Sequence, residues 1–136
     1  MFSGETEYSL SYYGRVPRDL EVQVRVLLAE DEWLIRMDLA WILEEQGCEV
    51  WEARDAEQAL AILEEVRTFD ALVTDVDMPG SLDGLTLAFA IRDRLPDCRT
   101  LFVSGEKEPT TGEMPEGSLF LSKPVSPATL IAGLRT

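Results

Sequence analysis

Short apolar runs alternate with segments of helical periodicity from Val24 to the C-terminus, and this alternation limits the possible folds more than any other feature. The runs are almost continuously apolar, which is typical of parallel strands buried on both faces. We therefore predict an α/β protein with a parallel sheet covered by helices. The predicted strands are 24–29, 49–53, 71–74, 100–103 and 118–121. The predicted helices include residues 35–46, 55–66, 84–95 and 126–136.

Local signals mark the ends of several predicted helices. Gly47 follows the last periodic residue of the first helix and is predicted to be its C-terminal cap. Asp55 and Gln58 have the spacing of a capping box at the start of the second helix. Ser126 and Pro127 form the usual cap and first-turn pair of the last helix.

Two segments are predicted to lack regular structure. Residues 1–23 mix glycine, proline, hydroxyl and tyrosine residues without steady periodicity, so we expect an irregular extension before a single domain at 24–136. Residues 105–117, between the last two strands, contain two prolines and three glycines. Because these residues oppose helix formation, we predict a loop in this connection.

The composition excludes several classes of function. A net charge of −14 argues against direct nucleic-acid binding, which requires clustered Lys and Arg. The chain has no histidine, which excludes Ser-His-Asp hydrolysis, zinc bound by histidine and a phosphohistidine on this chain. No apolar run approaches the ~20 residues of a membrane span, and the N-terminus does not have the pattern of a secretory signal. A cytoplasmic protein without membrane insertion is expected.

Polar side chains follow four of the predicted strands, at the edge where ligands of open parallel sheets bind. These residues are Glu30 and Asp31, Asp75 and Asp77, Ser104, and Lys123. Each is a weak signal when it is considered alone, and a helix cap or a turn explains the acids and the serine equally well, although a lysine after an apolar strand is less expected. Together they fit phosphoryl transfer, because Mg²⁺ prefers carboxylate ligands and a carboxylate can act as the nucleophile. A lysine and a hydroxyl then meet the charge of the transferred group.

Four segments of the chain resemble the receiver domains of two-component response regulators. They are LLAEDEWLI, LVTDVDMPGSLDGL, LFVSG and LFLSKPV, and they occur in the order of that family. The resemblance covers about residues 22–136 and indicates a stand-alone, single-domain receiver. It implies a flavodoxin-like, doubly wound sheet of five parallel strands in the order 2-1-3-4-5. The glycines and prolines of 105–117 predict that the family's fourth helix is here reduced to a loop.

The resemblance also implies a role for each polar residue. Asp75 is the phosphoacceptor, Ser104 the switch hydroxyl, Lys123 the phosphate-binding lysine and Phe120 the rotameric aromatic residue. The implied Mg²⁺ ligands are Glu30, Asp31, Asp75 and the backbone carbonyl of Asp77. A histidine kinase or histidine phosphotransferase would donate the phosphoryl group, and a protein target would read the result. A cis peptide at Lys123-Pro124 is implied as well.

Two other functions compete with this interpretation. Asp75 and Asp77 match the paired aspartates of haloacid-dehalogenase-type phosphatases, although that family places the pair after its first strand. A phosphatase would turn over repeatedly, whereas a receiver accepts one phosphoryl group and is not a turnover enzyme. The other alternative is a pseudo-receiver that only binds partners without phosphorylation.

The first helix carries a second apolar stripe. Trp33, Met37 and Trp41 lie opposite the stripe that faces the core. Three explanations stay open: the N-terminal extension covers the stripe, the phosphodonor docks on it, or a second copy of the chain binds there as a dimer.

The strand order also predicts the state of the two cysteines. Cys48 precedes the second strand and Cys98 the fourth. These strands lie three positions apart in the expected sheet, roughly 14 Å at strand spacing, beyond the ~7 Å limit for a disulfide. Both thiols are therefore expected to be free.

Overall fold

The structure is a computed structural model that describes residues 23–106 and 108–135. The predicted irregular extension, residues 1–23, lies outside the described residues apart from Gln23. The strands are β1 (Arg25–Ala29), β2 (Glu49–Ala53), β3 (Ala71–Thr74), β4 (Arg99–Ser104) and β5 (Leu119–Ser122). The α-helices are α1 (Trp33–Glu45), α2 (Ala56–Val66), α3 (Gly84–Arg94) and α4 (Pro127–Arg135).

All described strands are parallel and lie in the order β2-β1-β3-β4-β5, which confirms the predicted sheet. The chain order reverses at β1, which lies between β2 and β3. Residues Ala29 of β1 and Thr74 of β3 are register partners at the carboxyl ends of the two strands. The residues that follow them therefore leave the sheet side by side, at the switch point where such folds bind ligands.

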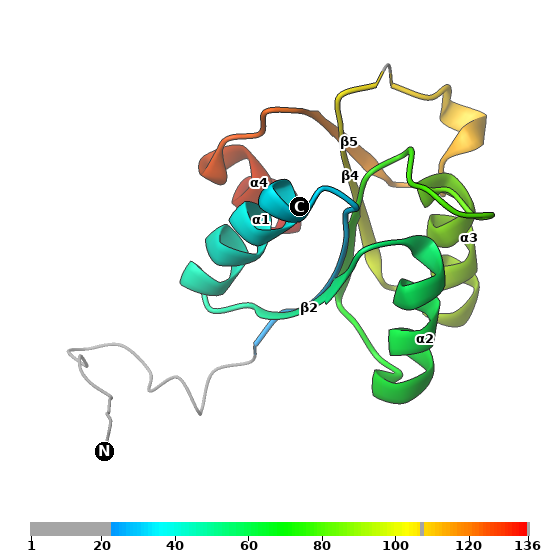
Figure 1. Ribbon diagram of the computed structural model, residues 1–136, viewed down its shortest axis with the longest axis horizontal. Coiled ribbons are helices and arrows are strands. Elements are labelled where there is room, and N and C mark those ends of the chain that lie inside the picture. Colours follow the sequence, from blue (N-terminus) through cyan, green and yellow to red (C-terminus); the bar gives the residue numbers. More distant parts are fainter. Residues whose placement is uncertain (1–22, 107, 136) are drawn as a thin grey trace.

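Helices cover the sheet on both faces (Figure 1). α2 and α3 pack on one face around Leu27, Leu72 and Phe102. α1 and α4 pack on the other face around Leu28 and Val73. Successive strand residues point to opposite faces, so a strand that is apolar throughout contributes to both clusters. This double burial explains the continuous apolar runs in the sequence.

The predicted helix ends are confirmed with one change of detail. Gly47 follows the cap residue Gln46 and has a φ of 90°, a conformation that favours glycine. Asp55 accepts a hydrogen bond from the Gln58 amide at 2.8 Å. The Gln58 side chain accepts from the amide of Arg54 rather than from that of Asp55, so the capping box is displaced by one residue on that side.

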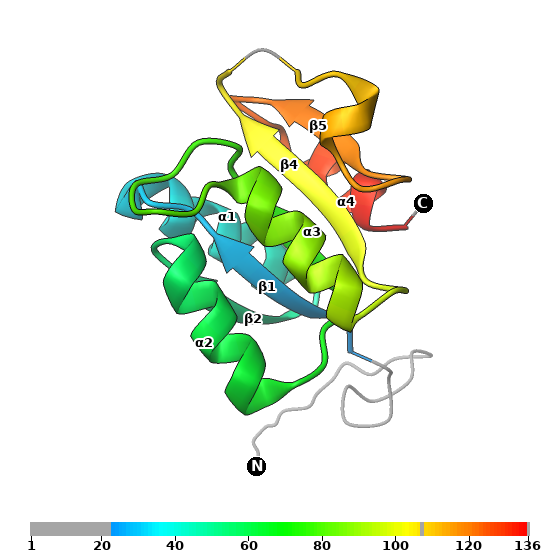
Figure 2. The same cartoon turned by 90° about the vertical axis from the view of Figure 1, so that its right-hand side faces the viewer.

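The connection between β4 and β5 forms no α-helix within its described residues. It contains one short 3₁₀ turn, Thr111–Glu113 (Figure 2). Pro115 is buried, and Arg92 of α3 donates a hydrogen bond to the carbonyl of Glu116 at 2.7 Å. The prediction of a loop here is confirmed, and the loop is attached to the body of the domain near its C-terminal end.

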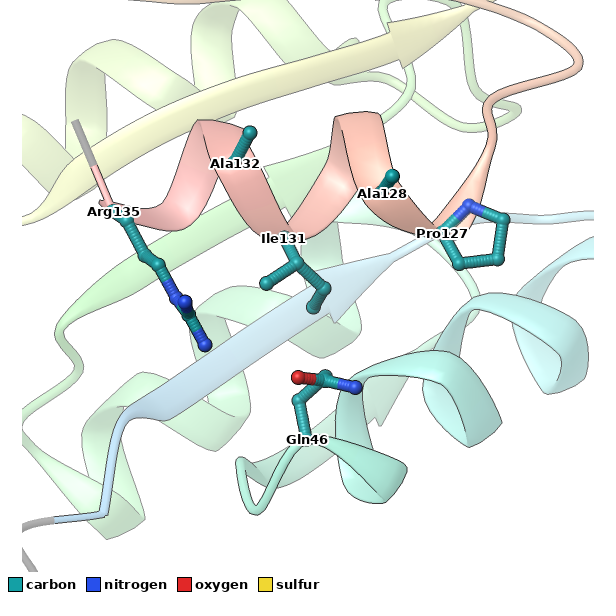
Figure 3. Close-up of a pocket in the computed structure, with 6 residues that line it drawn as sticks. All are labelled: Gln46, Pro127, Ala128, Ile131, Ala132 and Arg135. Carbon is teal, nitrogen blue, oxygen red and sulfur yellow. The ribbon is translucent and has the colours of Figure 1, made fainter.

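A pocket of about 500 Å³ separates the end of α1 from α4 (Figure 3). Its lining residues are Gln46, Pro127, Ala128, Ile131, Ala132 and Arg135. It includes none of the polar residues predicted for the site, so the candidate chemistry lies elsewhere. Among the described residues, no helix has the length and apolar character needed to cross a membrane.

Candidate functional site

Three carboxylates meet at the carboxyl ends of β1 and β3. Glu30 and Asp31 follow β1, and Asp75 follows β3; one carboxylate oxygen from each lies within 4.8 Å of the others. Glu30 is 1% exposed and Asp75 is 8% exposed, whereas Asp31 is open to solvent. The amide of Asp75 donates to the carbonyl of Ala29 at 3.2 Å, so the sheet ladder itself holds two of these acids together.

Lys123 bridges two of the three acids. It lies after β5, and its Nζ is 2.8 Å from Asp75 Oδ2 and 2.9 Å from Glu30 Oε1. The peptide that follows it, Lys123-Pro124, is cis, as the family resemblance implied. A lysine that follows the fifth strand thus reaches acids that follow the first and third strands.

The surroundings raise the pKa of both buried Glu30 and half-buried Lys123. Burial raises the pKa of Glu30 because the charged carboxylate loses water, and the hydrogen bonds from Lys123 and the Glu32 amide oppose this only in part. Burial alone would lower the pKa of Lys123, but its hydrogen bonds to Asp75 and Glu30 raise it overall. Lys123 therefore stays protonated at neutral pH and can balance the local negative charge.

The acidic cluster fits a hard divalent cation. Asp75 Oδ1 is buried, and within the described part of the chain it has no hydrogen-bond partner. A buried carboxylate oxygen without a partner is costly unless a ligand satisfies it. Glu30, Asp31 and Asp75 supply the oxygen ligands that Mg²⁺ prefers. Asp77, two residues after Asp75, is exposed at the start of the β3–α3 loop.

The two predicted switch residues occupy different surroundings. Ser104 ends β4 and is fully buried; its Oγ accepts a hydrogen bond from the amide of Glu106 at 3.1 Å. The described contacts of Ser104 include none to Asp75. Phe120 lies on β5, is half-buried and packs against the α2/α3 side of the core. Both residues therefore border the β4–β5 loop.

The structure adds supporting residues that the sequence reasoning missed. Arg36 of α1 donates to the carbonyl of Glu30 at 2.8 Å. Glu57 of α2 accepts hydrogen bonds from the amide and hydroxyl of Ser81, at 3.1 and 2.8 Å, and so ties down the β3–α3 loop. Gly84 starts α3 so close to Asp75 that a Cβ atom would overlap the Asp75 carbonyl. Of these residues, only Gly84 has a signal in the sequence, because it directly follows Asp83, the cap residue of α3. The other contacts depend on which elements lie close together in the fold.

This arrangement, a doubly wound sheet with an acidic cluster and a lysine at the switch point, defines a receiver-type α/β domain. The sequence matches the response regulator receiver domain family over residues 26–135. The chain therefore belongs to the response regulator receiver domain family.

Individual relatives agree with this family assignment. The transcriptional regulatory protein PdtaR of Mycobacterium tuberculosis is 38% identical over 85% of this chain and 57% of its own length. The sensor kinase CckA of Brucella abortus is 42% identical over 66% of this chain but only 10% of its own length. The chain thus spans about half of one of these relatives and a small part of the other.

Solved structures show the same fold. A response regulator receiver protein of Sinorhizobium medicae superposes with a TM-score of 0.78 at 26% identity, covering 83% of this chain and 92% of its own. The receiver domain of the hybrid histidine kinase CckA has a TM-score of 0.70 at 39% identity, covering 82% of this chain and 95% of its own.

The chain is accordingly a phosphoacceptor signalling domain of a two-component system, not a turnover enzyme. The phosphatase alternative is set aside on this ground. The family and its relatives also favour a phosphoacceptor over the pseudo-receiver that only binds partners. Among the described residues, both cysteines are free, as the strand order predicts.

Proposed function

We propose that Asp75 accepts a phosphoryl group from a histidine kinase or a histidine phosphotransferase, within a receiver domain formed by residues 24–136. The observation that carries this proposal is the buried, unpartnered Oδ1 of Asp75 inside the cluster of three acids, with Lys123 bound to the other oxygen. The same carboxylate is close to a candidate cation site and to the positively charged ammonium group of Lys123. A metal cation and a lysine ammonium group both stabilise the negative charge on a phosphoryl group during its transfer.

Each residue then has a defined part in the transfer. A carboxylate oxygen of Asp75 forms the new bond to phosphorus while the bond to the donor nitrogen breaks and its electron pair stays on that nitrogen. Bound Mg²⁺ would neutralise charge on the transferred oxygens, held by Glu30, Asp31, Asp75 and the carbonyl of Asp77. Lys123 binds a phosphoryl oxygen, and Ser104, whose Oγ accepts from the Glu106 amide, donates its hydroxyl hydrogen to another as it turns toward the phosphoryl group. This last change links phosphorylation to the β4–β5 loop.

Phosphorylation of the intact chain by acetyl phosphate tests the site. With Mg²⁺ present, intact-mass spectrometry should show one added phosphoryl group that hydrolyses as acyl phosphates do. Asp75→Asn should remove it, and chelation of Mg²⁺ should suppress it. Equal labelling of Asp75→Asn would contradict the assignment. Ser104→Ala should still be phosphorylated but should lose the associated conformational change.

The exposed face of α1 is the proposed docking surface for the phosphodonor. Trp33 and Trp41 are 62% and 61% exposed, and Leu34 and Met37 accompany them. Exposed acids surround this apolar patch; they are Glu32, Asp38, Glu44 and Glu45. An apolar centre with an acidic rim suits a helical partner with an apolar face and basic edges. The N-terminal extension, the other candidate cover, lies outside the described residues.

Two variants, Trp41→Ala and a deletion of residues 1–20, separate the three explanations of this patch. If the donor docks there, the variant slows transfer from a phosphorylated kinase but not from acetyl phosphate. Phe89→Ala is the matched control, because Phe89 is exposed on α3, on the opposite face of the sheet. A change in sedimentation with Trp41→Ala would instead support a dimer contact. Increased quenching of the tryptophans after deletion of residues 1–20 would support the extension.

A further inference from the structure

Arg36 is held in an unusual place for a helix-surface arginine. Its side chain is only 21% exposed, because the guanidinium turns back over the β1–α1 turn instead of extending into solvent. Nη1 donates to the carbonyl of Glu30 at 2.8 Å, and Nε lies 3.3 Å from Glu52 Oε1. Arg36 therefore connects the acidic turn after β1 to the neighbouring strand β2.

The turn that Arg36 holds has little other support on its helical side. Glu32, the N-cap residue of α1, makes no side-chain capping bond. The Glu32 amide is satisfied by the Glu30 carboxylate at 3.0 Å, which is also a candidate metal ligand. The amide of Glu30 donates to Ala53 of β2 at 3.0 Å, so its carbonyl is the group that needs a separate anchor. Arg36 supplies that anchor.

The acids at this turn repel one another when they are ionised. Glu30, Asp31 and Asp75 place carboxylate oxygens within 4.8 Å, and Lys123 sits between only two of them. A turn free to move would relieve this repulsion by separating the ligands, and metal binding would then have to restore their positions. A hydrogen bond from a fixed guanidinium to the turn backbone opposes that movement.

We propose that Arg36 is a positioning residue that holds the Glu30–Asp31 turn ready for Mg²⁺, with Glu52 as its outer anchor; this rests on the proposed function of the acidic cluster. The role depends on the shape of the side chain. Arginine directs Nη1 and Nε along fixed, different directions, so one group reaches Glu30 while the other reaches Glu52. A lysine has one nitrogen and cannot keep both contacts in this geometry.

Calorimetric titration of the intact chain with MgCl₂ tests the proposal. Loss of an outer-shell contact typically weakens metal binding by about 10- to 100-fold, and we expect about 10-fold for Arg36→Gln and nearly as much for Arg36→Lys. Glu52→Gln should weaken binding less, because it leaves the bond to Glu30. At saturating Mg²⁺ the rate of phosphorylation by acetyl phosphate should recover in all three variants, since Arg36 does not touch the phosphoryl group.

Arg54→Gln is the matched control. Arg54 directly follows β2 at the same edge of the sheet, its side chain is 68% exposed, and it pairs with Asp55 rather than with a site residue. The variant removes the same charge and should leave Mg²⁺ affinity unchanged. An equal loss of Mg²⁺ affinity in Arg36→Gln and Arg54→Gln would overturn the proposal, because it would show that only the long-range effect of the removed charge matters. Wild-type affinity in Arg36→Lys would also overturn it.

Hydrogen exchange gives a readout that is independent of activity. The amides of residues 30–33 should exchange faster in Arg36→Gln than in the wild type, in the absence of Mg²⁺. Unchanged exchange there would contradict a positioning role. If Arg36→Gln does not fold, as judged by circular dichroism, Arg36→Lys and Glu52→Gln decide the question by the same measurements. Failure of the wild type to bind Mg²⁺ would instead overturn the proposed function.

Discussion

At the scale of single residues, the site depends on close approaches that permit little change. Asp75 shows this most clearly: Lys123 holds one of its oxygens, and the first residue of α3 presses against its carbonyl. The hydroxyl of Thr74 donates a hydrogen bond to the backbone carbonyl of Asp75, and the amide of Gly84 donates one to the carbonyl of Val76. The position of Asp75, the proposed phosphoacceptor, is thus set by its backbone as much as by its side chain.

Gly84→Ala should destabilise the fold and displace Asp75. The added Cβ would overlap the Asp75 carbonyl, which cannot withdraw without moving the acid or α3. Overpacking of this kind costs about 3 kcal/mol, more than the gain in helix propensity from alanine. Urea denaturation measures the loss. Gly112→Ala is the control, since nothing lies within 4 Å of a Cβ built there. Equal stability of the two variants would contradict the close approach.

Cys98 should make stability fall at alkaline pH. Burial raises the pKa of its thiol from 9.0 to about 11. As the pH rises above 9, the unfolded thiol loses its proton while the folded thiol keeps it, so the unfolded state is favoured progressively until about pH 11. Below pH 9 this contribution to the pH dependence is absent.

The expected loss from Cys98 is about 2 kcal/mol at about pH 10.5, relative to about pH 8. Urea denaturation of the wild type and of Cys98→Ala under reducing conditions measures this loss. Lys123 titrates in both proteins, so the comparison separates the contribution of Cys98 from that of Lys123. The variant is less stable at both pH values because it leaves a cavity, but its stability should fall less between them. Parallel pH profiles for the two proteins would show that the thiol is not buried as described.

At the scale of elements, the β4–β5 connection is the part that departs from the family's usual arrangement. Interior proline and glycine cost a helix about 3 and about 1 kcal/mol respectively, and residues 105–117 contain two prolines and three glycines. Within the described residues a single 3₁₀ turn lies where the family usually has its fourth helix. The loop connects Ser104 to Phe120, so a change at either residue acts on a loop rather than on a preformed helix.

Phosphorylation should therefore order this loop instead of moving a helix. We expect fast amide exchange over residues 106–117 in the resting protein, with more protection near Glu116, which Arg92 binds. Mg²⁺ with beryllofluoride, as a phosphoryl mimic, should increase protection throughout the segment. Hydrogen exchange with mass spectrometry measures both states. A helical pattern of strong protection before activation would contradict the expectation.

At the scale of the whole molecule, charge and metal binding act together. A net charge of −14 makes the folded chain repel itself, and the most crowded acids lie in the candidate metal site. A cation that binds only the folded state stabilises it by mass action, by about 2.7 kcal/mol at one hundred times its Kd. Binding of a metal at this site would therefore be measurable as increased stability without any phosphodonor.

Added MgCl₂ should raise the melting temperature of the wild type more than NaCl at equal ionic strength. The NaCl series measures the screening of the net charge, and the excess measures specific binding. Asp75→Asn should lose most of the excess while it keeps the response to NaCl. Identical responses to the two salts in the wild type would contradict a specific site at Glu30, Asp31 and Asp75.

The pattern of residues along the chain is enough to predict the order and type of the elements and the edge of the sheet where the polar residues gather. Apolar runs, caps such as Asp55 and breakers such as Pro115 act over a few neighbouring residues, so they can be read along the chain. Parallel strands then bring the residues after Ala29 and Thr74 to one edge whatever their side chains are. For this reason the residue pattern alone was sufficient to identify Glu30, Asp31 and Asp75 as neighbours.

The side chains that support the site, by contrast, are found only from the way the elements pack in three dimensions. Arg36 reaches Glu52 on another strand, Glu57 reaches Ser81 in a distant loop, and Gly84 approaches Asp75 across a turn. Such contacts depend on distances of a few ångströms between elements, and no local pattern of residue types encodes them. The same holds for the exposed tryptophans of α1, whose spacing predicts a stripe but not its exposure, because burial is a property of everything that packs around a helix.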